Sequence, residues 1–209
     1  MKVPVHECFK QTIQGEGYWT GVLCDFIRLH GCPVGCPFCD SLYAPQDGGG
    51  RKAPRTLIDI ETLVSELAAP RVVITGGEPL IHSHLPHLID AILKTGRAVS
   101  LETSGAFWQD IHADVWVTLS PKTHVSPRFP VHEAMWQRAD EIKIVVVDGT
   151  ELAFYKPYLN ASCQNLYLQP EWDNRANTVP LVMEQIRSEW AIAHNVRLSL
   201  QSHKYLGLD

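Results

Sequence analysis

The sequence has no long apolar run, no dense block of basic residues and no apolar leader. No apolar run approaches the ~20 residues of a membrane-spanning helix, and the first residues, MKVPVHECFK, contain no apolar core. Lys and Arg number 18 against 23 Asp and Glu, so nucleic-acid binding through phosphate neutralisation is not expected. We therefore expect a cytoplasmic protein that has no membrane or nucleic-acid partner and acts on a small molecule.

The sequence also has no internal repeat and no shift in composition that would separate two domains. Its 209 residues are enough to bury a sizeable core, so a single domain over 1–209 is expected. The segment Pro45–Pro54 is rich in glycine and proline and is expected to form a flexible loop.

Short β-branched and apolar runs alternate with amphipathic stretches along the chain. The expected strands are Cys24–His30, Arg71–Thr75, Ala98–Glu102, Val115–Leu119, Glu141–Val147, Asn165–Gln169 and Val196–Gln201. The expected helices are Leu57–Leu67 with Asp59 as its cap, Leu85–Leu93 ending before Gly96, and Thr178–Ala193. Such alternation favours right-handed crossovers between parallel strands, so we predict an α/β fold, an incomplete (β/α) barrel of parallel strands.

Unusual polar segments follow most of the expected strands. These segments are Gly31–Asp40, Thr75–Pro79, Glu102–Gly105, Ser120–Lys122, Gln169–Glu171 and Ser202–Lys204. Each lies at the carboxyl end of a strand, and in parallel β/α folds these ends meet at the rim that carries the active site. The sequence therefore predicts one site built from all six segments.

Cys32, Cys36 and Cys39 lie within eight residues of one another. Thiols stay reduced in the cytoplasm, so this group favours metal binding over disulfides. Zinc would need a fourth ligand, for which His30 is a candidate, because the other cysteines are scattered singly. The alternative is an iron–sulfur cluster, in which three thiolates on four irons leave one iron open to a substrate or cofactor. The spacing favours the cluster.

Two motifs together resemble the radical S-adenosylmethionine (SAM) superfamily. The cysteines read C-x3-C-x-aromatic-C, with Phe38 before the last one, and TGGEP follows one β/α unit later. The segments QTIQGEGYWTG near the start and QSHKYLGLD at the end are similar to the 7-carboxy-7-deazaguanine synthase family. Further similar segments are FIRLHGCPVGCPFCD, VVITGGEPL, ETSG, VTLSPK, ADEIK and LYLQP. The resemblance covers nearly the whole chain.

The resemblance implies an enzyme with one 4Fe-4S cluster, SAM and Mg²⁺ as cofactors. In this family an external donor such as a flavodoxin supplies an electron, and SAM is cleaved to a 5′-deoxyadenosyl radical. The radical removes a hydrogen from 6-carboxy-5,6,7,8-tetrahydropterin, whose ring contracts to 7-carboxy-7-deazaguanine with release of ammonia. SAM is regenerated. The reaction is that of a carbon–nitrogen lyase in queuosine biosynthesis, and the resemblance further implies a homodimer.

The resemblance also assigns residues to the site. The cluster ligands are Cys32, Cys36 and Cys39. The SAM-binding residues are Phe38, Cys39, Asp40, Gly77, Glu102, Ser104, Ser120, Pro121, Lys122 and Gln169. The substrate-binding residues are Ile13, Gln14, Gly15, Glu16, Arg28, Thr75, His203 and the terminal Asp209. Ser41 is the implied magnesium ligand; the family usually has Thr there, and serine keeps the hard oxygen that Mg²⁺ requires.

Arg28 also follows from the chemistry of the substrate. A carboxylate calls for a bidentate cation, and the guanidinium of Arg28 supplies a planar fork. Strand alternation places Arg28 opposite Ile27 and Leu29, so its side chain is expected to point into the barrel. A strand arginine paired with a nearby acid fits the sequence equally well.

Two other functions stay open at this point. A different radical SAM enzyme, such as a glycyl-radical activase, would need a large surface for docking a protein, and the QGEG and SHKYL segments argue against it. A zinc-stabilised binding module would leave the polar segments at the strand ends without an explanation.

Overall fold

A nine-stranded sheet runs through the computed structural model, which describes residues 1–39, 55–159 and 165–208. The strand order is β3-β1-β2-β4-β5-β6-β7-β8-β9. The strands are β1 (Lys2–Ile13), β2 (Leu23–Leu29), β3 (Thr56–Asp59), β4 (Arg71–Gly76), β5 (Ala98–Thr103), β6 (Trp116–Leu119), β7 (Glu141–Val146), β8 (Leu166–Pro170) and β9 (Arg197–Leu198). Each neighbouring pair from β2 to β9 is parallel, and β1 is antiparallel to β2 and β3. This open, largely parallel sheet confirms the predicted incomplete barrel.

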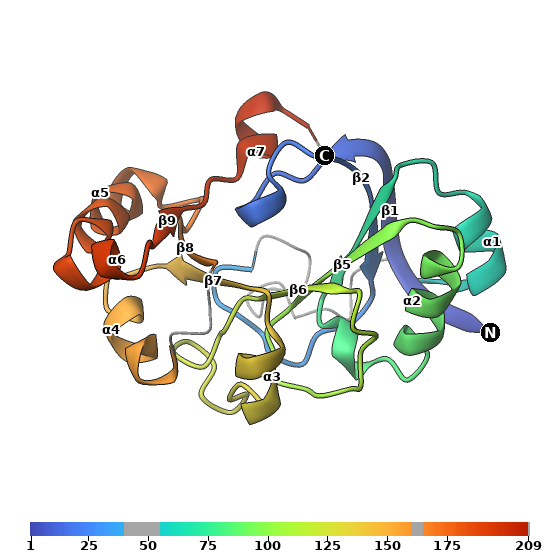
Figure 1. Ribbon diagram of the computed structural model, residues 1–209, viewed down its shortest axis with the longest axis horizontal. Helices are drawn as coiled ribbons and strands as arrows, with labels where there is room; N and C mark the ends of the chain where they lie inside the picture. The colour runs from blue at the N-terminus through green and yellow to red at the C-terminus, as the bar shows by residue number, and fades with distance from the viewer. Residues whose placement is uncertain (40–54, 160–164, 209) are drawn as a thin grey trace.

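Helices cover the outer side of the curved sheet (Figure 1). They are α1 (Ile60–Ser65), α2 (Leu85–Leu93), α3 (Glu133–Arg138), α4 (Glu151–Tyr155), α5 (Arg175–Ile186), α6 (Glu189–Ala193) and α7 (Ser202–Leu206). Short 3₁₀ helices in the described part of the chain are η1 (Gly17–Trp19), η3 (Pro79–Ile81) and η4 (Lys156–Tyr158). Figure 1 shows α7 apart from the others, across the open side of the sheet and near η1. Among the described residues, none of the helices has the length and apolarity that crossing a bilayer requires.

All seven predicted strands are present, but the last is shorter than expected, and two strands were not predicted. The missed strands are β1 and β3, which pair with each other at one edge of the sheet. Because Thr56–Asp59 belongs to β3, the helix predicted over Leu57–Leu67 begins only at Ile60. Asp59 occupies the predicted cap position, yet its side chain makes no cap hydrogen bond and lies near the amino groups of Met1 and Lys2 instead.

The other two helix predictions had different outcomes. The helix over Leu85–Leu93 is present as predicted, and Gly96 follows it with a φ of +81°. The helix predicted over Thr178–Ala193 is two helices, α5 and α6. The break is stabilised by Ser188, whose hydroxyl accepts a hydrogen bond from the amide of Ala191. The loop predicted over Pro45–Pro54 lies outside the described residues.

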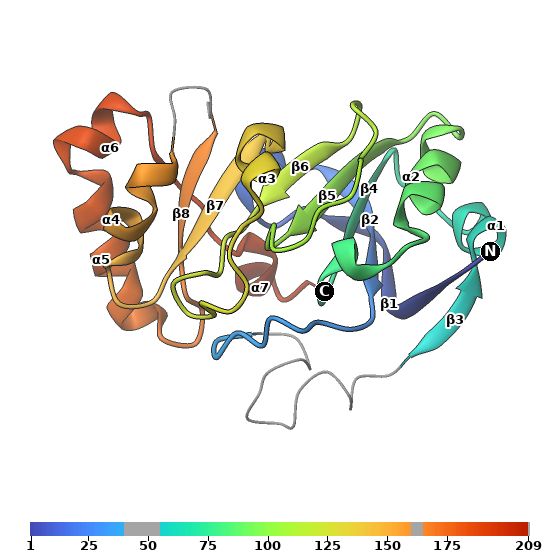
Figure 2. The ribbon, with the colours of Figure 1, turned by 90° about the horizontal axis from the view of Figure 1, so that it is seen from below.

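Strand side chains alternate between an apolar outer face and a polar inner face. The outward residues packed in the two cores include Ile27, Leu29, Val72, Ile74, Val99, Leu101, Ile142, Ile144 and Val146. The inward residues of the same strands include Arg28, Thr75, Glu102 and Lys143, which line a cavity. The period-2 geometry of a strand therefore separates the core from the site. Figure 2 shows the segment that follows β2 (blue) along the lower edge of the sheet.

Candidate active site

The carboxyl ends of the parallel strands surround a cavity of about 410 Å³. The predicted site residues that line it are Ile13, Gln14, Glu16, Arg28, Cys32, Cys36, Phe38, Cys39, Thr75, Gly77, Glu102, Ser104, Ser120, Lys122, Gln169 and His203. Gly15 and Pro121 lie beside lining residues without lining the cavity themselves. Asp40, Ser41 and Asp209 lie outside the described residues. The structure thus brings together most residues that the resemblance assigns to cluster, SAM and substrate.

The three cysteines lie on the segment after β2, beside the glycine turn that ends β4. The amide of Gly77 donates to the carbonyl of Leu29 at 3.1 Å, and the amide of Glu78 donates to Gly31 at 2.9 Å. A Cβ on Gly77 would overlap the Gly31 carbonyl and lie 2.6 Å from the Cβ of Cys32. Glycine is therefore required for the two loops to approach each other this closely.

The chemistry of these donors fits an iron–sulfur cluster. Burial raises the pKa of the Cys32 thiol to about 11 and also raises that of Cys36, which Lys122 opposes. Among the described residues, no three His, Cys, Asp or Glu side chains gather closely enough to hold a single metal ion. In a four-iron cluster each thiolate binds a different iron, so three cysteines that line one cavity suit it. His30, the candidate fourth zinc ligand, is not among the residues that line the cavity.

Glu78 organises the rim next to the cysteines. It is fully buried and accepts hydrogen bonds from the hydroxyl of Thr103 at 2.6 Å and from the amide of Ser104 at 2.9 Å. The hydroxyl of Ser104 and the amide of Leu80 also donate to it. Several charge-assisted bonds of this kind fix the turn after β4 against the end of β5. Sequence reasoning noted the TGGEP motif but did not assign this role to its glutamate.

Glu102 connects the inner face of β5 to the segment after β1. Its two carboxylate oxygens accept from the side-chain amide of Gln14 at 3.0 Å and from the hydroxyl of Thr75 at 3.2 Å. Gln14 and Thr75 were predicted on the substrate side and Glu102 on the SAM side. The hydrogen bonds show that these two parts of the predicted site are contiguous.

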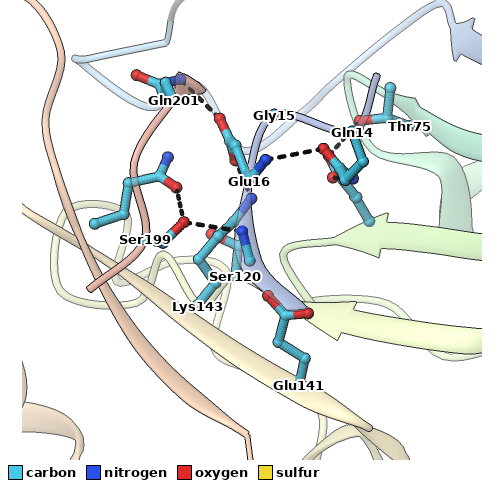
Figure 3. Close-up of polar contacts among 12 residues, drawn as sticks. Gln14, Gly15, Glu16, Thr75, Ser120, Glu141, Lys143, Ser199 and Gln201 are labelled. Carbon is cyan, nitrogen blue, oxygen red and sulfur yellow. Dashed lines mark hydrogen bonds and ion pairs between the residues drawn. The ribbon is translucent and has the colours of Figure 1, made fainter. Parts of the chain in front are cut away.

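Glu16 lies at the centre of a second set of polar contacts (Figure 3). One carboxylate oxygen is paired with the ammonium of Lys143, and the other accepts from the side-chain amide of Gln201 at 2.8 Å. The amide of Glu16 donates to the side chain of Gln14 at 3.2 Å. Sequence reasoning missed Lys143 and Gln201. The signal was available for Lys143, because a lysine within the apolar run EIKIVVV is exceptional unless it faces a polar interior.

Arg28 agrees with both expectations from the sequence, a side chain that points into the barrel and an arginine that pairs with a nearby acid. It lines the cavity, and its Nε also donates to the Glu7 carboxylate at 2.5 Å. Its guanidinium lies 5.8 Å from the ring centre of Phe9. Glu7 and Phe9 belong to β1, the strand that was not predicted, so this part of the surroundings of Arg28 could not be anticipated.

His203 reaches the cavity because α7 packs on the segment after β1. The amide and hydroxyl of Ser202 each donate to the Gly15 carbonyl at 2.9 Å. A Cβ on Gly15 would overlap the imidazole of His203, so glycine permits this contact. Gly15, which does not line the cavity, thereby sets the position of a residue that does.

Lys122 and Gln169 also line the cavity. The ammonium of Lys122 donates to the carbonyl and hydroxyl of Ser120 at 2.7 and 2.6 Å. Burial lowers the pKa of Lys122, and the Cys36 thiol opposes this effect. The Gln169 side chain accepts from the hydroxyl of Ser199 at 2.8 Å. When protonated, this half-buried lysine beside the cysteines supplies positive charge where an anionic cluster would lie.

Comparisons with known proteins agree with this arrangement. The family model described as the Radical SAM superfamily matches residues 26–148. The chain is 35% identical to the 7-carboxy-7-deazaguanine synthase of Escherichia coli K12 over 100% of both chains. It is 36% identical to that of Synechocystis, over 98% of this chain and 93% of the relative.

Two solved structures are also similar. The crystal structure of QueE from Escherichia coli has a TM-score of 0.79 at 33% identity and covers 97% of this chain and 95% of that one. Streptococcus suis SuiB bound to S-adenosylmethionine has a TM-score of 0.51 at 12% identity, covering 81% of this chain and 48% of that one. The second likeness concerns the fold alone.

Proposed function

Because the chain belongs to the 7-carboxy-7-deazaguanine synthase family of the radical SAM superfamily, we propose that it converts 6-carboxy-5,6,7,8-tetrahydropterin to 7-carboxy-7-deazaguanine. Family membership makes it an enzyme that uses a 4Fe-4S cluster and SAM on a small-molecule substrate. The reaction releases ammonia, which makes it a carbon–nitrogen lyase reaction, and its product enters queuosine biosynthesis. Residues 1–209 act as a single radical SAM domain in this proposal.

Cys32, Cys36 and Cys39 hold the cluster, and Gly77 allows the turn after β4 to approach it. When bound, the cluster and SAM supply the one-electron chemistry that removes a hydrogen atom from the substrate. The proposed SAM-binding residues with described positions are Phe38, Cys39, Gly77, Glu102, Ser104, Ser120, Pro121, Lys122 and Gln169. The proposal extends to Asp40 from the family resemblance.

The pterin occupies the part of the cavity nearer to β1 and α7. Arg28 binds its carboxylate, for which the guanidinium offers a planar fork. Glu16 accepts hydrogen bonds from its N–H groups, and Ile13, Gln14, Gly15, Thr75 and His203 surround it. A reactive radical attacks whatever lies nearest, so these residues also serve to hold the substrate in one orientation and to exclude water.

Further parts of the proposal come from the family resemblance. Ser41 provides a hydroxyl ligand to Mg²⁺, and the C-terminal carboxylate of Asp209 closes the substrate site. The protein acts as a homodimer in the cytoplasm and receives its electron from an external donor such as a flavodoxin.

The observation that carries the proposal is the convergence of the three cysteines, Arg28 and His203 on one cavity. The test is to purify the protein without oxygen, reconstitute the cluster, and add SAM, reductant and the carboxytetrahydropterin. We expect brown, iron-containing protein and formation of 7-carboxy-7-deazaguanine, detected by mass spectrometry. Cleavage of SAM without this product would indicate a different radical SAM reaction, and colourless protein that binds zinc would indicate a binding module.

A further inference from the structure

Lys143 is a buried lysine on the inner face of β7 to which neither the cluster nor the SAM site assigns a role. Its side chain is 6% exposed and lines the cavity. We propose that Lys143 is a positioning residue for the substrate: it holds Glu16 in place, as a carboxylate, to accept the N–H groups of the pterin. This inference rests on the proposed function and deepens it.

The geometry restrains Glu16 from two sides (Figure 3). Lys143 approaches one carboxylate oxygen from β7, and Gln201 donates to the other from the start of α7. Gln201 is itself held by Lys204, whose ammonium donates to its side-chain oxygen at 3.3 Å. Glu16 therefore has little freedom to leave the cavity wall that it lines.

The charges around Lys143 explain why a cation is needed at this position. Burial alone lowers the pKa of Lys143, but the carboxylates of Glu16, Glu102 and Glu141 together raise it above its ordinary value. Lys122 is the other cation that interacts with Lys143, while His203 and Lys204 of α7 also line the cavity. A neutral residue in place of Lys143 would leave three carboxylates close together in a buried space.

Removing the positive charge therefore favours protonation of Glu16. A protonated carboxyl gains a donor and loses acceptor capacity, so it binds N–H groups less well than a carboxylate does. The loss should be greatest at low pH and should diminish as rising pH ionises Glu16 again. A lysine that only filled space would not produce this pH dependence.

The test uses the reconstituted full-length protein with SAM and titrates 6-carboxypterin, the oxidised fluorescent form of the substrate. We expect Lys143→Gln to weaken binding about 10- to 100-fold at low pH, as for loss of a hydrogen bond to a charged group. The deficit relative to wild type should shrink as pH rises, because rising pH ionises Glu16 again. Comparison with wild type at each pH cancels the titration of the probe itself.

Two further variants serve as controls. Lys143→Arg keeps the positive charge. The ratio of its affinity for 6-carboxypterin to that of wild type should therefore not change with pH. Lys94→Gln neutralises an exposed lysine at the end of α2 and should bind 6-carboxypterin as wild type does. Reductive SAM cleavage without substrate should be similar in Lys94→Gln and wild type, because Lys94 lies outside the cavity.

Double-variant data test the proposal even if Lys143→Gln fails to fold. Glu16→Gln/Lys143→Gln removes both members of the ion pair and should bind no more weakly than Glu16→Gln alone, because Lys143 acts through Glu16. An additional loss in the double variant, or Lys143→Gln binding within twofold of wild type at every pH, would overturn the proposal. If the wild type itself makes no deazaguanine product, the proposed function fails instead.

Discussion

Three carboxylates of the cavity, those of Glu78, Glu102 and Glu16, accept hydrogen bonds from parts of the chain that are distant in the sequence. Glu78 joins the turn after β4 to the end of β5, Glu102 joins β5 to Gln14 and Thr75, and Glu16 joins β7 to α7. A carboxylate can accept about four hydrogen bonds, which makes it an efficient connector of segments. At the scale of single residues, the walls of the cavity are fixed by these connections.

Glu141 differs from the other three carboxylates because burial has the largest effect on its pKa. It accepts from the amide of Tyr18 at 3.2 Å and from the indole of Trp116 at 3.3 Å, while its other oxygen has no hydrogen-bond partner among the residues that the structure describes. Burial raises the pKa of Glu141, which Lys143 opposes. In the folded protein this carboxyl therefore binds its proton more tightly than in the unfolded chain.

A prediction about stability follows for Glu141→Gln. Where the folded protein binds more protons than the unfolded chain, stability falls as pH rises, because deprotonation favours the unfolded state. Gln keeps an oxygen for Tyr18 and Trp116 and carries no charge. The free energy of unfolding of Glu141→Gln should therefore exceed that of wild type increasingly as pH rises above the ordinary carboxyl range. Urea unfolding across this pH range measures the difference; a constant difference would contradict the prediction.

At the scale of elements, η1 packs against the amino ends of β4 and β6. It places Tyr18 and Trp19 against Trp116, with ring centres 4.7 and 5.3 Å away. The guanidinium of Arg71 lies 3.7 Å from the ring centre of Trp19. Arg71 and Trp116 are the first residues of β4 and β6, so this aromatic layer lies at the amino ends of the parallel strands. It separates Glu141 and Lys143 from solvent at that end.

We predict that Trp19→Ala lowers the free energy of unfolding by about 2 kcal/mol, less than for a fully buried Trp. The lost ring removes contacts with Trp116 and Arg71 and lets water approach Glu141. Urea unfolding measures the loss of stability, and hydrogen exchange of the Tyr18 amide measures the approach of water. Trp108→Ala is the matched control, because Trp108 is 40% exposed and stacks on His132 away from this layer. Equal effects of the two substitutions would contradict a special role for η1.

At the scale of the whole molecule, the segment after β1 and helix α7 meet over the open side of the sheet (Figure 1). The segment after β1 and helix α7 are joined by the bonds of Ser202 to Gly15 and of Gln201 to Glu16. The sheet itself is not closed by hydrogen bonds between β3 and β9. This contact between two segments that are distant in the sequence therefore closes one side of the cavity.

The substitution Gly15→Ala tests this closure. Its methyl group would overlap His203, so α7 must shift, and overpacking of this kind lowers the free energy of unfolding by about 1–3 kcal/mol. We expect markedly weaker binding of 6-carboxypterin, measured by fluorescence. Gly96→Ala is the control, because φ there is positive and a methyl group meets no neighbour. Gly96→Ala should lose comparable stability through backbone strain but bind 6-carboxypterin as wild type does. If its affinity also fell, the weaker binding of Gly15→Ala would result from lost stability alone.

Much of the fold could be predicted because strand periodicity and helix caps are local properties. The seven parallel strands and the helix Leu85–Leu93 followed from patterns within a few residues. Strand β1 was missed because its sequence, KVPVHECFKQTI, mixes apolar and polar residues and contains a proline. With β1 missing, the pairing of β3 and the contact of Arg28 with Glu7 could not be derived either.

The sequence by itself determined which chemical groups are present and at which strand ends they lie, because a strand places alternate residues on opposite faces and a loop follows where it stops. Only the tertiary structure decided which groups meet. Glu16 and Lys143 are 127 positions apart, and Glu16 and Gln201 are 185 apart. Burial of a charge is tolerated only when a partner is within reach, and that proximity arises when the sheet curves and α7 packs across its open side.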